Sequence, residues 1–363
     1  MVASISARGG VQATLGYYGH LGQDDYYLRG HEPPGRWAGE GAARLSLDGP
    51  VIRSEFEAVL KGIDPKTGAR LTAVGGHHQN HAAGWDVTFS APKSVSVLWA
   101  LSDADRRQPI EQAQRVAVAT ATKHLEQTAA FARRGKGGTI REPAAGLTLA
   151  KFDHHTSRDL DPQLHTHVFV FNVAARKDGT WGAIVSRELY KAQKQAGAIY
   201  RDALATELER HGYGIERAGN NFRVAAIPRA VERAFSKRRE SIEAAAAAHC
   251  YHTPKGMEHA ALRTRQAKRA MPREYLFAAW KAEARAMGFV LRQTRTLGRV
   301  ALPNEVNTPA STSMMNTFAS VERAVGQLGA AARAIDANSV MPGVAVSLSA
   351  REHRARLTLD RDR

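Results

Sequence analysis

A cluster of four histidines in one short segment constrains the fold of this chain more than any other feature. Residues 152–173 read F-D-H-H-T-S-R-D-L-D-P-Q-L-H-T-H-V-F-V-F-N-V, with apolar residues on both sides of a polar stretch. This pattern predicts two strands, Gly146–His155 and Gln163–Ala174, around the polar connection T-S-R-D-L-D-P. A polar connection this short favours a hairpin of the two strands.

The predicted hairpin brings the histidines together on one face. Residues two apart in a strand share a face, so His165 and His167 project together. If residues 156–163 form the connection, His154 pairs with His165. Phe152 then pairs with His167, which puts the third imidazole diagonal to His154 and within reach of the same ion.

Three neutral imidazoles with an open coordination position are what a Lewis-acid metal site requires. An isolated H-x-H on a strand is more often an ordinary surface or core pair, but a third histidine on the facing strand favours a metal. His155 should face the opposite way and is left out of the set. A structural zinc site is normally closed by four ligands, usually with cysteine, and this chain has only Cys250. The sequence therefore predicts a metal site made by His154, His165 and His167.

The rest of the chain alternates strand and helix signals. Trp85–Ser90 predicts a strand, and Pro92 and Lys93 predict the start of a helix. The composition changes after Pro303, so we expect one domain over residues 1–303 and a tail over 304–363. Further predicted elements are helices over Ile110–Phe131, Ser186–His211, Arg229–Ala248, Pro272–Met287 and Val321–Ile335, and a hairpin over Gly212–Ala226.

The charge of the chain indicates a polyanionic partner. The sequence holds 51 Lys and Arg residues against 35 Asp and Glu residues, a formal net charge of +16 with a pI near 10.2. Nucleic acid fits this surplus. Membrane insertion does not, because apolar runs such as Val97–Leu101 and Val168–Ala175 fall short of the about 18 residues that a spanning helix needs. The lone Cys250 and the missing secretory segment after Met1 predict a cytoplasmic protein.

Several basic side chains are candidates for contact with phosphates. Lys93 opens a predicted helix whose N-terminus could receive a phosphate. The other candidates lie in the hairpin connection and on the predicted helix Arg229–Ala248: Arg158, Lys237, Arg238 and Arg239. Such contacts give affinity for DNA that does not depend on its base sequence. The basic residues therefore indicate DNA binding only when they are taken together.

Four of the nine tyrosines form two pairs near the N-terminus: Tyr17, Tyr18, Tyr26 and Tyr27. A tyrosine attacks phosphorus as the phenolate, and populating that form at pH 7 costs about 4 kcal/mol for a free pKa near 10. A nearby metal or base must offset this energy. Paired aromatics by themselves are more often packing anchors. Together with the histidines and the net charge of +16, however, they favour metal-assisted phosphoryl transfer.

Four motifs resemble those of MobF (TrwC/TraI-like) conjugative relaxases, which belong to the HUH endonuclease superfamily. They are Y-Y-x7-Y-Y near the N-terminus, G-W-D-V-T-F-S-A-P-K-S-V-S over 84–96, H-H-T-S-R-D-L-D-P-Q-L-H-T-H over 154–167, and F-S-K-R-R-E-S-I-E over 235–243. The resemblance covers about residues 1–303. It implies an α+β fold with a central antiparallel β-sheet, flanking helices and a helical region that clamps single-stranded DNA. The chain lacks the G-x-x-x-x-G-K-[ST] loop of the helicase domain that usually follows.

The resemblance also implies roles for single residues. The two catalytic tyrosines fall on Tyr17 and Tyr26, with Tyr18 and Tyr27 as substitutes because the spacer is one residue longer than the family pattern. The active-site aspartate falls on Asp86, which could accept the tyrosine proton or orient a metal-bound imidazole. We favour the second role, because a carboxylate near pKa 4 is a poor base for a phenol near 10. The metal ligands fall on His154, His165 and His167.

The implied reaction is metal-assisted nicking of single-stranded DNA at an origin of transfer. A tyrosine becomes linked to the 5′ phosphate, and the transferred strand is later rejoined. The resemblance implies Mg²⁺ or Mn²⁺ in function, with Zn²⁺ or Ni²⁺ able to occupy the site. The implied partners are single-stranded and hairpin origin-of-transfer DNA, relaxosome proteins and type IV secretion coupling proteins, with the chain itself a monomer. The alternatives are an HUH rolling-circle replication initiator and a non-catalytic basic DNA-binding protein with structural zinc.

Overall fold

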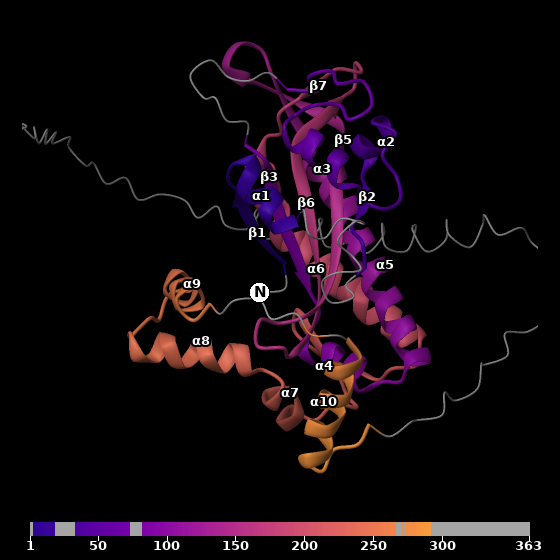
Figure 1. The fold of residues 1–363 in the computed structure, drawn as a ribbon, viewed down its shortest axis with the longest axis vertical. Helices are drawn as coiled ribbons and strands as arrows, with labels where there is room; N and C mark the ends of the chain where they lie inside the picture. The colour runs from indigo at the N-terminus through magenta and orange to yellow at the C-terminus, as the bar shows by residue number, and fades with distance from the viewer. Residues whose placement is uncertain (1–2, 19–32, 73–81, 266–270, 272, 292–363) are drawn as a thin grey trace, which may run out of the picture. The chain divides into compact units, whose positions relative to one another are not determined.

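An antiparallel sheet carries the histidine hairpin (Figure 1). The computed structural model describes residues 3–18, 33–72, 82–265, 271 and 273–291. The strands of the sheet are Ala3–Arg8 (β1), Arg36–Ala38 (β2), Gly84–Ser90 (β3), Phe131–Arg134 (β4), Ile140–Thr156 (β5), Pro162–Arg176 (β6) and Trp181–Gly182 (β7). Their order is β1-β3-β6-β5-β2, with β4 paired to β5 and β7 paired to β6. The two long strands β5 and β6 are therefore flanked on both sides, and the predicted histidine strands lie inside them.

Helices cover both faces of this sheet (Figure 1). Their bounds are Val11–Tyr18 (α1), Glu40–Arg44 (α2), Arg53–Leu60 (α3), Lys93–Leu101 (α4), Ala104–Ala129 (α5), Ser186–Arg210 (α6), Arg229–Ala234 (α7), Lys237–Ala248 (α8), Pro254–Arg263 (α9) and Arg273–Ala286 (α10). A 3₁₀ turn spans Lys136–Gly138, and a small hairpin joins Ile215–Ala218 (β8) to Asn221–Val224 (β9). Within the described part of the chain, every helix is too short or too polar to cross a lipid bilayer.

The alternation of side chains in β5 and β6 divides the interior into two cores. Leu149 and Val168 face α4, α5 and α6 in the larger core. Phe152 and Phe169 face the opposite way, into a smaller core with residues of α1, α2 and α3. Because residues two apart share a face, the face that holds Phe152 continues to His154. The predicted metal site therefore lies on the side of the sheet that α1 covers.

Gly84 allows the start of β3 to approach β6 closely. It begins β3 with φ +154°, and a Cβ at this position would lie 2.2 Å from the Val170 carbonyl oxygen on β6. Only glycine fits so close a backbone approach. The motif that begins G-W-D therefore needs its glycine to seat the strand that carries Asp86.

One predicted helix is wrong. Arg229–Ala248 forms two helices, α7 and α8, because the chain leaves helical geometry at Phe235 and Ser236. Phe235 is fully buried in the larger core, and the Arg238 N–H at the start of α8 donates to the Asp161 carboxylate at 3.3 Å. Core burial and this capping contact stabilise the break. The candidates Lys237, Arg238 and Arg239 therefore all lie on α8, whereas Arg229 and Arg233 lie on α7.

Within the described residues, the other predicted helices and the hairpin agree closely with the observed elements, but not every observed helix was predicted. The predicted helix Ser186–His211 and the hairpin Gly212–Ala226 are confirmed. The helix expected from Ile110 begins earlier, at Ala104. Helix α9 was not predicted, although Thr253 accepts a hydrogen bond from the Gly256 N–H at 3.1 Å, an N-cap signal that its sequence T-P-K-G carries. The helix expected over Val321–Ile335 lies outside the described residues.

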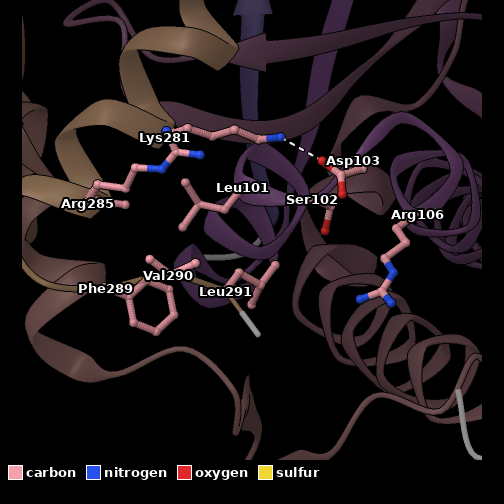
Figure 2. Close-up of a pocket in the computed structure, with 10 residues that line it drawn as sticks. Leu101, Ser102, Asp103, Arg106, Lys281, Arg285, Phe289, Val290 and Leu291 are labelled. Atoms are coloured by element: carbon pink, nitrogen blue, oxygen red, sulfur yellow. Dashed lines mark hydrogen bonds and ion pairs between the residues drawn. The ribbon is translucent and has the colours of Figure 1, made fainter. Parts of the chain in front are cut away.

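Helix α10 lies beside the end of α4 and the start of α5 (Figure 2). Figure 2 shows Lys281 of α10 pointing toward Asp103, and its Nζ donates to Asp103 Oδ1 at 2.7 Å. Asp103 occupies the N-cap position of α5, where a carboxylate also favours the helix dipole. The pair itself is exposed and adds little, and the buried Leu276, Trp280 and Ala284 attach α10 to the larger core.

Candidate metal centre and active site

The predicted register is confirmed, and it brings the three histidines together. His154 lies opposite His165, and Phe152 lies opposite His167. The ring centroids are 5.2 Å apart for His154 and His165, 4.9 Å for His154 and His167, and 5.1 Å for His165 and His167. One ligand nitrogen of each ring lies within 4.8 Å of the others. This spacing suits a single ion bound through imidazole nitrogens at about 2.0–2.1 Å each.

Hydrogen bonds at Nδ1 fix the orientation of two of these rings. His165 Nδ1 lies 2.9 Å from the Gln163 carbonyl oxygen, and His167 Nδ1 lies 2.9 Å from Asp86 Oδ1. A carbonyl and a carboxylate only accept, so each Nδ1 carries the proton and each Nε2 keeps its lone pair. This is the tautomer that binds a metal. The residues present therefore fit a divalent metal ion.

Asp86 is buried in the middle of the sheet rather than at its edge. Its strand, β3, lies between β1 and β6, and the residue is 1% exposed. Burial alone raises the pKa of Asp86, but hydrogen bonds from His167 and Tyr18 and the charge of Arg8 outweigh it and hold the pKa below its usual value. Asp86 thus remains a carboxylate that holds His167. This geometry supports the orienting role over proton acceptance.

His155 faces the other side of the sheet, as predicted. Its ring stacks on Trp99 with centroids 5.0 Å apart and planes 16° apart. Burial, aided by the nearby positive charge of Arg273, lowers the pKa of His155 well below its usual value. A neutral ring stacked on an indole belongs to the larger core, separate from the metal ligands.

Comparison with known proteins identifies the family. Residues 11–287 match the family model described as TrwC relaxase. The chain belongs to the TrwC relaxase family. Its curated relatives include the multifunctional conjugation protein TraI of Escherichia coli, 34% identical over 319 residues. TraI of Escherichia coli strain K12 is 34% identical over 284 residues. These alignments cover 84% and 75% of this chain but only 18% and 16% of the relatives, so the chain spans less than a fifth of their length.

Solved structures of relaxases share the fold. The conjugative relaxase TrwC in complex with oriT DNA has a TM-score of 0.70 at 34% identity, covering 80% of this chain and 100% of that one. A metal-bound complex of TrwC with oriT DNA gives 0.70 at 32% identity over the same shares. TrwC with a 27-mer DNA comprising the recognition hairpin and the cleavage site gives 0.66 at 30% identity, again covering 80% and 100%. The expected α+β relaxase fold with an antiparallel sheet and flanking helices is therefore confirmed.

The relaxase-family tyrosine motif begins in α1. Tyr18, at the end of this helix, is 1% exposed and packs against Phe152 and Phe169 with ring centroids 5.1 and 5.2 Å apart. Its ring centroid lies 6.3 Å from that of His167. Tyr17 is also part of α1, but its side chain lies outside the described part of the structure. Tyr26 and Tyr27 also lie outside it.

Two basic residues of the relaxase motifs serve the fold itself. The Lys93 ammonium donates to the Pro162 carbonyl oxygen at 2.9 Å. The Arg238 guanidinium donates to the carbonyl oxygens of Ala261 and Thr264 at 2.7 Å each and so caps the end of α9. Phosphate contact by Lys93 and Arg238 stays a prediction, and these internal partners argue against it.

The other basic candidates are more accessible. Lys237 Nζ forms an ion pair with Glu283 at 2.7 Å. The Arg239 side chain is 76% exposed and pairs with Glu243 one helical turn away at 2.6 Å. Exposed pairs of this kind are worth little, so Arg239 can exchange its carboxylate for a phosphate. Arg158 lies in the connection between β5 and β6, close in sequence to the metal centre.

Arg8, the partner of the buried aspartate, is not among the residues that the sequence predicts for the site. Arg8 ends β1 and donates to the Asp86 carboxylate. It also lies over the Tyr18 ring, with its Cζ 5.8 Å from the ring centroid. The alternation A-S-I-S-A-R over residues 3–8 is a strand signal. Nothing in that pattern says that this strand pairs with β3, so the contact could not be read from it.

Proposed function

We propose that this relaxase-family chain nicks single-stranded DNA at an origin of transfer and exchanges a phosphodiester bond for a phosphotyrosine bond. The observation that carries the proposal is the cluster of three imidazoles on the sheet face that packs against α1, the helix that contains Tyr17. The complexes of TrwC with oriT DNA support the same choice of substrate. A net charge of +16 gives the chain the affinity for a polyanion that this substrate requires.

The reaction conserves bond energy. The tyrosine oxygen bonds to phosphorus while the bond from phosphorus to the 3′ oxygen breaks, which leaves a 5′-phosphotyrosine and a free 3′-hydroxyl. One ester replaces another, so the same site can rejoin the strand after transfer. A divalent ion held by His154, His165 and His167 supplies polarisation of a non-bridging phosphate oxygen. Asp86 keeps the His167 ring in its metal-binding tautomer and orientation.

The proposal extends to the ion, the partners and the extent of the domain. Mg²⁺ or Mn²⁺ serves in function, whereas Zn²⁺ and Ni²⁺ also suit imidazole ligands. The DNA partner includes both the single strand and the hairpin beside it, and relaxosome and type IV secretion coupling proteins assist. The chain acts as a monomer in the cytoplasm of a bacterium. Residues 1–303 suffice for nicking and strand transfer.

We assign the first nucleophile to Tyr17 and the second to Tyr26. The burial of Tyr18 supports this choice, because its ring fills the smaller core against Phe152 and Phe169. A side chain fixed in this way is poorly placed for in-line attack on a phosphate. The second tyrosine is needed because the first stays linked to the 5′ end when the regenerated nick site returns.

Matched phenylalanine variants test the assignment. Labelled single-stranded origin-of-transfer oligonucleotides are incubated with protein and Mg²⁺, then run on denaturing gels. Tyr17→Phe should reduce the covalent adduct by at least about 100-fold, since the nucleophile is gone. Tyr18→Phe should retain most of it, because only a buried hydroxyl is lost. Tyr26→Phe should form the first adduct but fail to transfer a second labelled strand.

Two results would contradict these proposals. Loss of the adduct in Tyr18→Phe with full activity in Tyr17→Phe would exchange the roles within the first pair. Release of a free 5′ phosphate with no protein-linked product would mean a nuclease instead of a relaxase.

A further inference from the structure

A cavity of about 400 Å³ lies on the face of the sheet opposite the metal centre, between β2, β5 and α5. Lys151 and Asp153 of β5 and Thr166 of β6 form its floor. These residues alternate along the strands with the histidines, so the two sites share strands but face opposite ways. Arg36 of β2 and Arg115 of α5 complete the charged part of the wall.

The one carboxylate among the lining residues is already fully engaged. Asp153 Oδ1 accepts from Thr166 Oγ1 at 2.7 Å, and Asp153 Oδ2 accepts from Arg36 Nη2 at 3.0 Å. Arg115 Nε lies 3.5 Å from the same Oδ2. Thr166 Oγ1 in turn accepts from Gln114 Nε2 at 3.3 Å, which holds the carboxylate in place. Asp153 therefore has little capacity left to neutralise a further cation.

Lys151 is the cation that this arrangement leaves without an ion pair. Among the described residues, no carboxylate oxygen lies within 4.0 Å of its Nζ. Burial lowers the pKa of Lys151, and the charge of Arg36 acts in the same direction; the charges of Asp153 and Glu126 oppose them, and the resulting pKa is about 8. A buried ammonium of this kind is stabilised by any anion that enters the cavity beside it.

The lining carries three cations and one carboxylate. Glu111 stands outside the lining and reaches Arg115 only at 3.9 Å, while its closer contact is Arg273 at 3.0 Å. The positive excess around Lys151 and Arg36 thus remains. Guanidinium groups and an ammonium that converge on one space are the donors that bind phosphate in proteins.

We propose that this cavity binds the phosphate of a nucleotide-sized ligand. Lys151, Arg36 and Arg115 hold the phosphate, and the less polar remainder of the ligand lies against Val116 and Ala119 of α5. The volume lies within the range of small-molecule sites, and an apolar wall with a few convergent charged groups is their usual composition. This site goes beyond the nicking reaction, since it lies on the opposite sheet face and uses none of the metal ligands.

Binding can be measured without cleavage, so it does not depend on the proposed nicking activity. Isothermal titration calorimetry of the full chain uses inorganic phosphate and thymidine 5′-monophosphate as probes, with EDTA present to keep the metal centre empty. Lys151→Met removes the ammonium and keeps its length. Lys177→Met, on an exposed turn that does not line the cavity, is the control for lost charge. We expect Lys151→Met to weaken binding by at least about tenfold and Lys177→Met to leave it unchanged.

A second variant and a second probe complete the test. Arg115→Gln should weaken binding by a similar factor. If Lys151→Met does not fold, Arg115→Gln is the variant that tests phosphate binding in the cavity. A single-stranded oligonucleotide distinguishes the two sources of phosphate. If a DNA strand supplies it, Lys151→Met also weakens oligonucleotide binding and lowers its salt slope by about 1. If a free nucleotide supplies it, only binding of the monophosphate falls. Absence of binding to the wild-type chain, or equal affinity in the wild type and both cavity variants, would overturn the proposal.

Discussion

At the residue scale, Asp86 positions one ring of the proposed metal site. Its carboxylate accepts from His167 Nδ1, while Arg8 on the neighbouring strand holds it from the other side. Acceptors behind metal-binding histidines typically change metal affinity by about 10–100-fold when they are removed. We therefore propose that Asp86 acts on the metal site through the orientation and the proton of the His167 ring.

We therefore expect Asp86→Asn to weaken Mn²⁺ binding by about 10–100-fold. The amide keeps the size of the side chain but loses the charge that favours the protonated Nδ1. Competition titration against a chelator measures the affinity, with Asp105→Asn on the exposed start of α5 as the control. Equal Mn²⁺ affinity in wild type and Asp86→Asn would show that the carboxylate does not support the site.

The burial of Lys151 should make the free energy of unfolding depend on pH. Its pKa is about 8 in the folded chain and 10.5 as an ordinary lysine. Between these values the unfolded chain binds more protons than the folded one, so the free energy of unfolding rises with pH across this window. Lys93 has a similar shift for the same reason, burial, and adds to the effect.

Lys151→Met should therefore stabilise the chain at pH 7 by about 1–3 kcal/mol, because a buried charge is removed. This advantage should shrink toward pH 10, where the wild-type lysine is neutral in the folded state. Urea unfolding at both values in buffers free of phosphate measures the difference. A variant that is less stable at pH 7 would mean that the ammonium has a stabilising partner.

At the scale of elements, the connection between β5 and β6 joins the histidine strands to the helices beyond the sheet. Its Asp161 accepts from the Arg238 N–H of α8, and the Leu160 carbonyl oxygen accepts from Trp280 Nε1 of α10 at 2.9 Å. The carbonyl of Pro162 binds Lys93 of α4. Three helices thus hold one short connection, and their positions depend on it.

Asp161→Ala should loosen this junction. The carboxylate is 1% exposed, and its removal leaves the Arg238 amide unsatisfied and takes away a negative charge that favours the Lys93 ammonium. We expect a loss of about 2–3 kcal/mol in urea unfolding and faster amide exchange at the start of α8. Asp48→Ala, at an exposed position between α2 and α3, is the control and should change stability by less than about 0.5 kcal/mol. Slow exchange in α8 after Asp161→Ala would show that other contacts position this helix.

At the scale of the whole molecule, we expect the metal centre and the basic residues to have separable functions. The positive charge is spread over many elements, whereas the metal centre occupies one face of two strands. Phosphate contacts give affinity that does not depend on a bound ion.

EDTA should therefore abolish nicking while it changes the affinity for a single-stranded oligonucleotide by less than about twofold. Gel assays of cleavage and fluorescence anisotropy of binding, on the same metal-free sample, measure the two properties. Raising the salt concentration should do the reverse and weaken binding first. Full cleavage by metal-free protein would remove the metal from the reaction.

The sequence by itself determined the hairpin and the histidine register. Strand periodicity is a local property, and the short connection leaves one pairing that places His154 opposite His165. Because the side-chain period is two, the same pattern also sent His155 to the opposite face. The motifs also indicated the family. Each motif lies within one segment, so the spacing of its residues can be read directly from the sequence.

Tertiary structure decided what depends on segments far apart in the chain. Arg8 meets Asp86 across 78 positions because β1 pairs with β3, and neither strand encodes its neighbour. Arg238 binds the end of α9, although its sequence context indicated an exposed basic helix. The cavity around Lys151 exists only where α5 crosses the sheet beside β2. Such contacts form when packing brings distant surfaces together, and local propensity carries no record of which surfaces will meet.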